Sequence, residues 1–199
     1  MPGGCVRLDF PATSRNSAPI LEVLTDVLPD EGLLLELASG SGQHAAAFAP
    51  RLPRLRLQPS DPDPRHRASI DAWCAGLPNV ARAIELDVRE PWPLTAADAV
   101  VCINMVHIAP WSCAEALVAG AASILPRGGV LYLYGPFKRD GRHTSPSNAR
   151  FDEGLRARDP SWGVRDLEAV SALASAVGLA LERTVEMPAN NLSVVLRMG

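Results

Sequence analysis

Acidic side chains stand where apolar segments of the chain end, and a loop of small residues follows the first of them. Leu33–Leu37 is an apolar run broken by Glu36, and Ala38-Ser39-Gly40-Ser41-Gly42-Gln43-His44 comes directly after it. Asp61 and Asp87 follow two later segments that contain apolar residues. Carboxylates attract cations and accept hydrogen bonds from sugar hydroxyls, whereas they repel pyrophosphate in a crevice of low dielectric constant. The pattern predicts a site for a cationic nucleoside such as S-adenosylmethionine.

The glycine spacing alone fits a second kind of cofactor. Gly40-x-Gly42-x-x-Ala45, followed about twenty residues later by Asp61, also matches the dinucleotide fingerprint. An NAD-dependent oxidoreductase is therefore a minor alternative, which Glu36 disfavours. Asp61 is expected to accept ribose hydroxyls, although Ser60, Asp61 or Asp63 should also cap the next helix. The residues expected to bind S-adenosylmethionine are Glu36, Ser39, Gly40, Gly42, His44, Asp61, Asp87, Val88, Asn104 and Met105.

One histidine follows a predicted strand at the position where a substrate would meet the cofactor. His107 lies in the segment Asn104-Met105-Val106-His107-Ile108-Ala109-Pro110-Trp111. Histidine is the side chain that exchanges a proton near neutral pH, so His107 is the candidate catalytic base. The alternative is a hydrogen-bonded structural histidine at the start of a helix. Trp111 either walls the pocket or belongs to the core.

Polar segments elsewhere are candidates for substrate binding. Gly135 to Asn148 is expected to be a long loop at the pocket mouth, where Lys138 or Arg142 could bind an anionic group. A solvated surface loop is the alternative, and asparagine in a hairpin turn is also expected for backbone reasons. Residues 1–16 are expected to be irregular and could close as a lid. The candidate substrate-binding residues are Arg15, Asn16, Tyr134, Lys138, Asn148, Asn190 and Asn191.

Strand and helix patterns alternate along the chain, which predicts an α/β fold. The fold expected is Rossmann-like, with a seven-stranded, mostly parallel sheet, helices on both faces and a C-terminal antiparallel hairpin. Ligands of such sheets bind at the carboxyl ends of the strands. Helices are expected at about residues 17–28, 43–50, 64–75, 114–125 and within 164–178. Strands are expected at 33–37, 54–58, 80–86, 98–104, 130–134, 181–186 and 192–197.

Composition limits the classes of protein that this chain can be. Its 199 residues suit one domain, residues 1–199, and 47% of them are hydrophobic. The formal net charge of −3 disfavours a nucleic-acid partner. No pair of the cysteines Cys5, Cys74, Cys102 and Cys113 has the C-x-x-C spacing of a zinc or redox site. Without a signal-like or membrane-spanning segment, the expected location is the cytoplasm and no metal or membrane partner is expected.

Several motifs taken together resemble the methyltransferase-like 26 family, long catalogued as a domain of unknown function. The similarity extends over about Thr13 to Met198, and one departure from it is Ser14, where the family tends to have an acid. It implies a class I methyltransferase fold and S-adenosylmethionine binding through Gly40, Gly42, Asp61 and Asp87, with no known substrate. The motifs are Arg15-Asn16, Ala38-Ser39-Gly40-Ser41-Gly42-Gln43-His44, Gln58-Pro59-Ser60-Asp61, Asn104-Met105-Val106-His107-Ile108-Ala109-Pro110-Trp111, Tyr134-Gly135-Pro136-Phe137, Ser147-Asn148, Arg158-Asp159-Pro160-Ser161-Trp162-Gly163 and Met187-Pro188-Ala189-Asn190-Asn191.

These observations together predict an S-adenosylmethionine-dependent methyltransferase. Its substrate is expected to be a small polar molecule, because the chain leaves no room for a separate recognition domain. A non-catalytic S-adenosylmethionine-binding sensor or partner module of the same fold is the alternative, since no obvious catalytic acid or base accompanies the loop. The sequence gives no indication of the oligomeric state.

Overall fold

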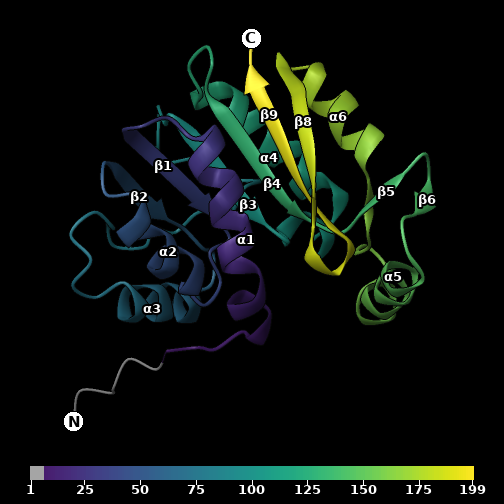
Figure 1. The fold of residues 1–199 in the computed structure, drawn as a ribbon, viewed down its shortest axis with the longest axis horizontal. Coiled ribbons are helices and arrows are strands. Elements are labelled where there is room, and N and C mark those ends of the chain that lie inside the picture. The colour runs from purple at the N-terminus through teal and green to yellow at the C-terminus, as the bar shows by residue number, and fades with distance from the viewer. Residues whose placement is uncertain (1–6) are drawn as a thin grey trace.

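The computed structural model describes residues 7–199 and shows a twisted sheet with helices packed on both faces (Figure 1). In this part of the chain the sheet has six strands in the order β2-β1-β3-β4-β9-β8. The first four are parallel, whereas β9 pairs antiparallel with both β4 and β8. The strands are β1 (Gly32–Leu37), β2 (Leu55–Pro59), β3 (Ala99–Ile103), β4 (Val130–Gly135), β8 (Leu179–Met187) and β9 (Asn191–Met198).

Helices connect the strands, and a small second sheet lies beside α5 (Figure 1). The helices are α1 (Pro11–Val27), α2 (Gln43–Phe48), α3 (Pro64–Trp73), α4 (Trp111–Ile124), α5 (Pro146–Arg158) and α6 (Leu167–Ser175). Short 3-10 turns are η1 (Ala49–Arg51), η2 (Met105–His107) and η3 (Pro188–Asn190). The second sheet, in the order β6-β5-β7, consists of β5 (Phe137–Arg139), β6 (Arg142–His143) and β7 (Arg165–Asp166).

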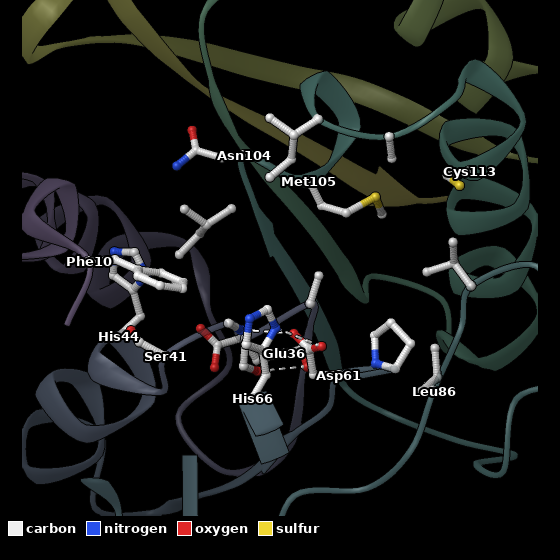
Figure 2. A pocket seen from close by; sticks show the side chains of 18 of the residues that line it. Phe10, Glu36, Ser41, His44, Asp61, His66, Leu86, Asn104, Met105 and Cys113 are labelled. Carbon is white, nitrogen blue, oxygen red and sulfur yellow. Dashed lines mark hydrogen bonds and ion pairs between the residues drawn. The ribbon is translucent and has the colours of Figure 1, made fainter. Parts of the chain in front are cut away.

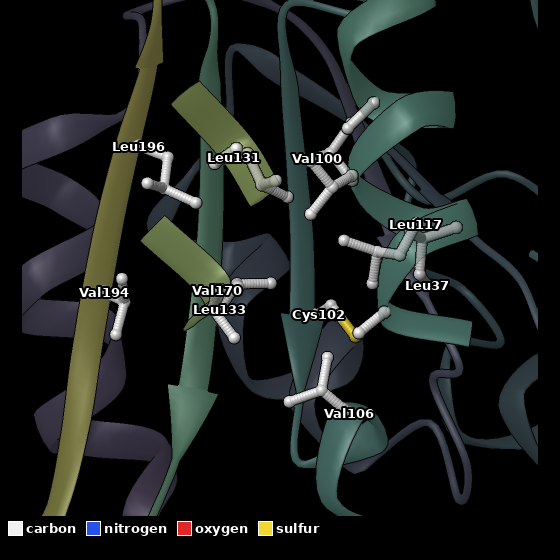
Figure 3. Close-up of a cluster of buried hydrophobic side chains, with 14 of the residues drawn as sticks. Leu37, Val100, Cys102, Val106, Leu117, Leu131, Leu133, Val170, Val194 and Leu196 are labelled. Carbon is white, nitrogen blue, oxygen red and sulfur yellow. The ribbon is translucent and has the colours of Figure 1, made fainter. Parts of the chain in front are cut away.

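Alternating residues of β1 divide the core into two layers. Leu35 and Leu37 face a buried cluster that includes Leu117 of α4 and Val170 of α6 (Figure 3). Leu34 faces the opposite layer, in which it joins residues of α1 such as Leu24. Successive side chains of a strand point to opposite faces, so both faces of β1 must be apolar. The central strand is thereby fixed between two helical layers, and its carboxyl end opens where the parallel strands stop.

The predicted strand at 80–86 is not a strand, and the prediction of seven strands is therefore wrong. Val80 and Ile84 form only isolated bridges to Leu57 and Ser60. Pro59 lies between these bridges and has no N–H to donate to a regular ladder. The Gln58 side chain instead donates to the carbonyl of Arg82 at 2.8 Å. The segment thus runs along the edge of β2 without completing a seventh strand.

Residues 7–16 are more ordered than the sequence indicates. The first helix begins at Pro11 rather than near Ser17, and proline at its first position suits a helix start. Ser17 lies inside this helix, and its hydroxyl donates to the Thr13 carbonyl one turn earlier. Residues 1–6, the remainder of the predicted irregular segment, and Cys5 among them, lie outside the described residues.

Helix α5 replaces the end of the predicted loop and the segment after it. Ser145 caps this helix by accepting the N–H of Asn148, and Pro146 occupies its first turn. Only Leu155 among its apolar side chains is buried, and Phe151 is exposed. Such a weak apolar stripe is hard to detect in a sequence. Among residues 7–199, no helix is long and apolar enough to cross a membrane.

Candidate functional site

A cavity of about 510 Å³ opens at the carboxyl ends of the parallel strands. In Figure 2 its side chains extend from His44 and Phe10 at one end to Leu86 and Cys113 at the other, with Glu36 and Asp61 between them. The cavity is therefore elongated and acidic in its middle. The predicted cofactor residues that line it are Glu36, Ser39, Gly40, His44, Asp61, Asp87, Val88, Asn104 and Met105.

Gly42, also predicted to bind the cofactor, does not line the cavity. It adopts a left-handed conformation with a φ of +88°, and a Cβ there would lie 2.5 Å from the Cα of Ile70. A side chain would therefore both strain the backbone and collide with α3. Gly42 shapes the turn from β1 into α2, which allows Gly40 and Ser41 to face the cavity.

Replacing Gly42 by alanine is expected to destabilise the protein by about 3 kcal/mol or more, because the collision adds to the backbone strain. Gly76→Ala is the matched control, since Gly76 has a φ of +85° but no atom within 4 Å of its added Cβ. That control should cost only about 1 kcal/mol. Urea unfolding of both variants measures the difference, and equal losses would contradict the close packing of the loop on α3.

Glu36 is the most unusual carboxylate of the cavity. It lies near the carboxyl end of β1 with only 5% of its surface exposed. Its Oε2 is buried without a hydrogen-bond partner in the described part of the chain. Burial raises the pKa of Glu36 to about 7, and Asp61 adds to the rise while a hydrogen bond from Ser39 opposes it. A buried carboxylate oxygen without a partner, aimed into a cavity, is suited to a cationic ligand.

Asp61 is held rigidly at the end of β2. Its Oδ2 accepts the Gly40 N–H at 3.0 Å, and its Oδ1 accepts the Asp63 N–H at 2.9 Å. Its Oδ1 also lies 3.0 Å from Nδ1 of His66, which must be the donor because a carboxylate only accepts. The neighbouring Asp63, not Asp61, caps α3 by accepting the N–H of Arg65. Asp61 therefore joins the glycine loop to α3 and leaves Oδ2 with capacity for a further hydrogen bond.

Asp87 and Asn104 line the cavity from two other segments. Asp87 pairs with Arg89 at 2.6 Å, and the hydrogen bond from Arg89 lowers the pKa of Asp87. Asn104 ends β3 in a left-handed conformation with a φ of +65°, which asparagine tolerates better than most residues. Its N–H donates to the Tyr134 carbonyl at 2.8 Å. Backbone contacts thus fix the turn that presents Asn104 and Met105.

His107, the predicted catalytic base, does not line the cavity. It is buried, with Nδ1 3.4 Å from the N–H of Arg165 and its ring edge-to-face against Phe137. Burial and the nearby Arg165 lower the pKa of His107 to about 3. Gly135 leaves room for the ring, since a Cβ there would lie 2.4 Å from Nε2. His107 is therefore placed as a neutral histidine that packs η2 against the second sheet.

The structure does not bring all the predicted substrate-binding residues to the cavity. Asn16 lines it, whereas Tyr134 is buried and does not. The amide of Asn148 donates to the Asn190 carbonyl at 2.8 Å, so these two asparagines join α5 to the hairpin turn. Arg15, Tyr134, Lys138, Asn148, Asn190 and Asn191 do not line the cavity.

Lys138 is engaged in a charge cluster on Asp152 of α5. The Asp152 carboxylate accepts the Val164 N–H at 2.7 Å and pairs with Lys138, His143 and Arg156 at 3.2–3.3 Å. Burial alone would raise the pKa of Asp152, but the hydrogen bonds from Val164 and Lys138 outweigh it, and the pKa lies below its ordinary value. The cluster fastens α5 to the second sheet.

Asp152→Ala is expected to destabilise the protein by about 3 kcal/mol, because it leaves the Val164 N–H and the Lys138 ammonium without their acceptor. Glu153→Ala, on the exposed face of the same helix, is the matched control and should have little effect. Thermal unfolding of the two variants compares them. An equally small effect of both changes would mean that Asp152 does not hold α5 in place.

The sequence motifs do not predict several of the residues that line the cavity. Phe10 lies against Gly40, with its ring edge-to-face to His66 at 5.9 Å. Its N–H donates to the Gln43 side chain at 2.8 Å, which ties the N-terminal segment to α2. His66 has a signal in the sequence, because it lies three residues, about one helical turn, after Asp63, which caps α3. The other missed lining residues include Ala12, Thr13, Pro62, Arg89, Ile108, Cys113 and Trp162.

The described residues give no indication of a metal centre. Within residues 7–199 no group of three or more histidine, cysteine or acidic side chains could hold a metal ion. Cys74, Cys102 and Cys113 are free and buried, and burial raises the pKa of the Cys74 thiol to about 12. These thiols are therefore not poised as nucleophiles.

Comparison with known proteins supports the same architecture. Residues 8–198 match the model of a family described as "Protein of unknown function (DUF938)". An O-methyltransferase family protein from Burkholderia thailandensis is similar in structure, with a TM-score of 0.80 and 20% identity over 94% of this chain. Human N-acetylserotonin methyltransferase, solved in complex with SAM, has a TM-score of 0.78 and 18% identity over 94% of this chain.

This chain spans only a little over half the length of the Burkholderia and human proteins. The chain covers 57% of the Burkholderia protein and 53% of the human enzyme. The YcgJ protein from Bacillus subtilis is also similar, with a TM-score of 0.68 and 20% identity over 87% of this chain and 73% of its own. At these identities the similarity shows a methyltransferase fold.

Proposed function

The chain belongs to the DUF938 family, and from its methyltransferase fold and acidic cavity we propose that it is an S-adenosylmethionine-dependent methyltransferase. The finer similarity to the methyltransferase-like 26 family, seen in the sequence motifs, supports the same proposal. One observation carries it. The buried Oε2 of Glu36 has no partner in residues 7–199, although it lines a cavity at the carboxyl ends of the strands. A cationic ligand would supply that partner.

The charges of the cavity fit S-adenosylmethionine better than a dinucleotide. The charged side chains that line it are Glu36, Asp61, Asp87 and Arg89, and Arg89 is paired with Asp87. The remaining charge is that of the Asp61 carboxylate and, above about pH 7, that of Glu36. This negative charge repels pyrophosphate and attracts a sulfonium or an ammonium. In the proposed arrangement Glu36 faces the cationic part, Asp61 accepts a ribose hydroxyl on Oδ2 and Asp87 lies near the adenine.

When bound, S-adenosylmethionine supplies a methyl group that its sulfonium already activates. The main task of this chain is then to align an acceptor with that group. Apolar side chains complete the lining of the cavity, among them Phe10, Leu86, Val88 and Ile108. The side chains of Asn16 and Asn104 offer hydrogen bonds to an acceptor without contributing charge.

The acceptor proposed is a small, uncharged polar molecule. A cavity of about 510 Å³ lies in the range of small-molecule sites, which favours a metabolite over a polymer. Lys138, which the sequence suggests for binding an anionic group, forms an ion pair with Asp152 instead. No membrane or nucleic-acid partner is proposed. The proposed location is the cytoplasm, and the proposed unit of function is the single domain formed by the chain.

Transfer of label from [methyl-³H]S-adenosylmethionine tests the proposal. The purified protein is incubated with a metabolite extract from cells, and tritium in compounds other than the donor is measured. We expect label in a small-molecule fraction, and none with heat-denatured protein. Folded protein that binds S-adenosylhomocysteine but transfers no label would favour the non-catalytic sensor instead.

A further inference from the structure

Residues 7–10 form a short segment, here called the strap, which lies directly before α1 and belongs to no helix or strand. Its backbone is attached to α3. The Leu8 N–H donates to the Ser69 hydroxyl at 2.8 Å, and the indole N–H of Trp73 donates to the Leu8 carbonyl at 2.8 Å. The Arg7 guanidinium also lies over the Trp73 ring, 5.0 Å from its centroid.

The last residue of the strap forms part of the cavity wall. Phe10 lines the cavity at the end where His44 also lies (Figure 2). A Cβ built on Gly40 would lie 3.1 Å from the Phe10 ring, so the ring is in close contact with the glycine loop. In the proposed arrangement the cationic part of S-adenosylmethionine faces Glu36, next to this end. The strap therefore bounds the end of the cavity beside the proposed cationic group.

One side chain, Gln43, joins the strap to the glycine loop. Its Oε1 accepts the Phe10 N–H and the Ser41 hydroxyl, both at 2.8 Å, and its Nε2 donates to Oδ1 of Asp9 at 2.9 Å. An N–H can only donate and a carboxylate can only accept, so an amide satisfies both strap residues at once. Gln43 does not itself line the cavity, although Phe10 and Ser41 do. Its contacts thus connect two parts of the cavity wall.

The strap is held weakly compared with the helix that follows it. None of its four residues is buried, and Leu8 alone is half-buried. In α1, by contrast, Ile20 and Leu24 are fully buried in the core. Segments with few buried apolar contacts and exposed hydrogen bonds open locally at a low cost in free energy. The strap can therefore detach while α1 stays packed.

We propose that the strap opens and closes over the cofactor site, and that Gln43 is the positioning residue that holds it closed. In the open state Phe10 no longer bounds the cavity, and the cofactor enters or leaves. In the closed state both steps are slowed. Gln43 therefore controls the rate of cofactor exchange without lining the cavity. The identity of the cofactor rests on the proposed function, whereas opening of the strap is a property of the free protein.

Hydrogen exchange of the Leu8 and Phe10 amides, measured by NMR, tests the opening without any ligand. Gln43→Glu keeps the acceptor for Phe10 but sets a second carboxylate against Asp9, so both amides should exchange about tenfold faster. Adding Asp9→Asn reverses the polarity of the pair, because asparagine can donate to the new carboxylate, and should restore slow exchange. Asp9→Asn alone is the control and should exchange slowly. Unchanged exchange in Gln43→Glu, or fast exchange that the double variant keeps, would overturn the proposal.

Binding of S-adenosylhomocysteine, followed by surface plasmon resonance, tests the effect on the site. In Gln43→Glu association and dissociation should both be about tenfold faster, because the strap must open for either, and the affinity should change by less than about threefold. The double variant with Asp9→Asn should restore both rates. A loss of affinity with neither rate increased would mean a distorted site and would overturn the proposal.

Phe10→Ala removes the ring that bounds the cavity and should also speed dissociation of S-adenosylhomocysteine. Phe151→Ala is the matched control, since Phe151 is 46% exposed against 41% for Phe10 but lies on α5, outside the cavity. Equal dissociation rates in these two variants would contradict the role of Phe10. If the unchanged protein binds no S-adenosylhomocysteine, the proposed function fails, and amide exchange still decides whether Gln43 holds the strap.

Discussion

Glu36→Gln is expected to weaken S-adenosylmethionine binding by roughly 10- to 100-fold and, at the same time, to stabilise the free protein. The loss of affinity follows because glutamine keeps the size of the side chain but removes the charge that faces a cation. Interactions with charged groups in such sites contribute about 1.5–3 kcal/mol, which corresponds to this range of affinity. Calorimetric titration of both proteins at pH 8 measures the difference.

The gain in stability has a definite pH dependence. The pKa of Glu36 is about 7 in the folded protein against an ordinary value of 4.5, so between these values the folded form binds more protons than the unfolded form. Stability contributed by this group is therefore lost as the pH rises from about 4.5 to about 7. Glutamine does not titrate, so the variant does not lose this stability. The free energy of unfolding of the variant should therefore exceed that of the unchanged protein by about 3 kcal/mol at pH 8.

The control for this experiment is Glu31→Gln, since Glu31 is exposed just before β1. Its unfolding curves should follow those of the unchanged protein at every pH. Urea unfolding from pH 4 to pH 8 provides the comparison. A Glu36→Gln variant that is less stable at pH 8 and binds S-adenosylmethionine normally would show that Glu36 has a structural partner instead of a ligand.

Asp61→Asn is expected to weaken cofactor binding by at least about 30-fold and to destabilise the protein by about 2 kcal/mol. The Asp61 carboxylate accepts hydrogen bonds from Gly40, Asp63 and His66, and all three donors require an acceptor. An amide can present its oxygen to only one side. Its NH₂ group would then face either the Gly40 N–H or the two other donors, and the glycine loop would lose its attachment to β2.

Asp63→Asn is the matched control, two residues away. Asp63 caps α3, and asparagine caps a helix about as well, so the melting temperature and the cofactor affinity should be nearly unchanged. Differential scanning fluorimetry with and without S-adenosylhomocysteine measures both quantities. Equal behaviour of the two variants would contradict both the role of Asp61 in joining the glycine loop to α3 and its proposed contact with the ribose.

The sequence allows the central strands and the acidic cavity to be predicted because both follow from short-range patterns. Apart from Glu36, Leu33–Leu37 is apolar on both faces, as a strand buried between helical layers must be. Glu36, near the end of β1, and Asp61, after β2, line one cavity because parallel strands end at one edge of the sheet. Asp87 lines the same cavity although the segment before it is not a strand.

Features that depend on distant contacts could not be predicted. The segment 80–86 has the composition of a strand, but Pro59 in its neighbour interrupts the ladder. The sequence around Lys138 does not show an ion-pair partner for it, yet in the structure it pairs with Asp152 of α5. His107 follows β3 directly, but the ring is buried against Phe137 and away from the cavity.

His44 illustrates the same limit for chemistry. Its position after the glycine loop places it at the cavity, and the sequence predicted it as a cofactor-binding residue. The hydrogen bond to Asn16 comes from a residue 28 positions earlier in the chain. Only the folded arrangement, which brings α1 against α2, pairs Nε2 of His44 with that side chain.

Isothermal titration of the folded protein with S-adenosylhomocysteine, alongside S-adenosylmethionine and NAD⁺, tests the central claim most directly. We expect one site that binds both adenosyl compounds, with S-adenosylmethionine the more weakened by Glu36→Gln, and no heat of binding for NAD⁺. Absence of binding of both adenosyl compounds to protein that unfolds cooperatively, or binding of NAD⁺ instead, would contradict the assignment of the cavity.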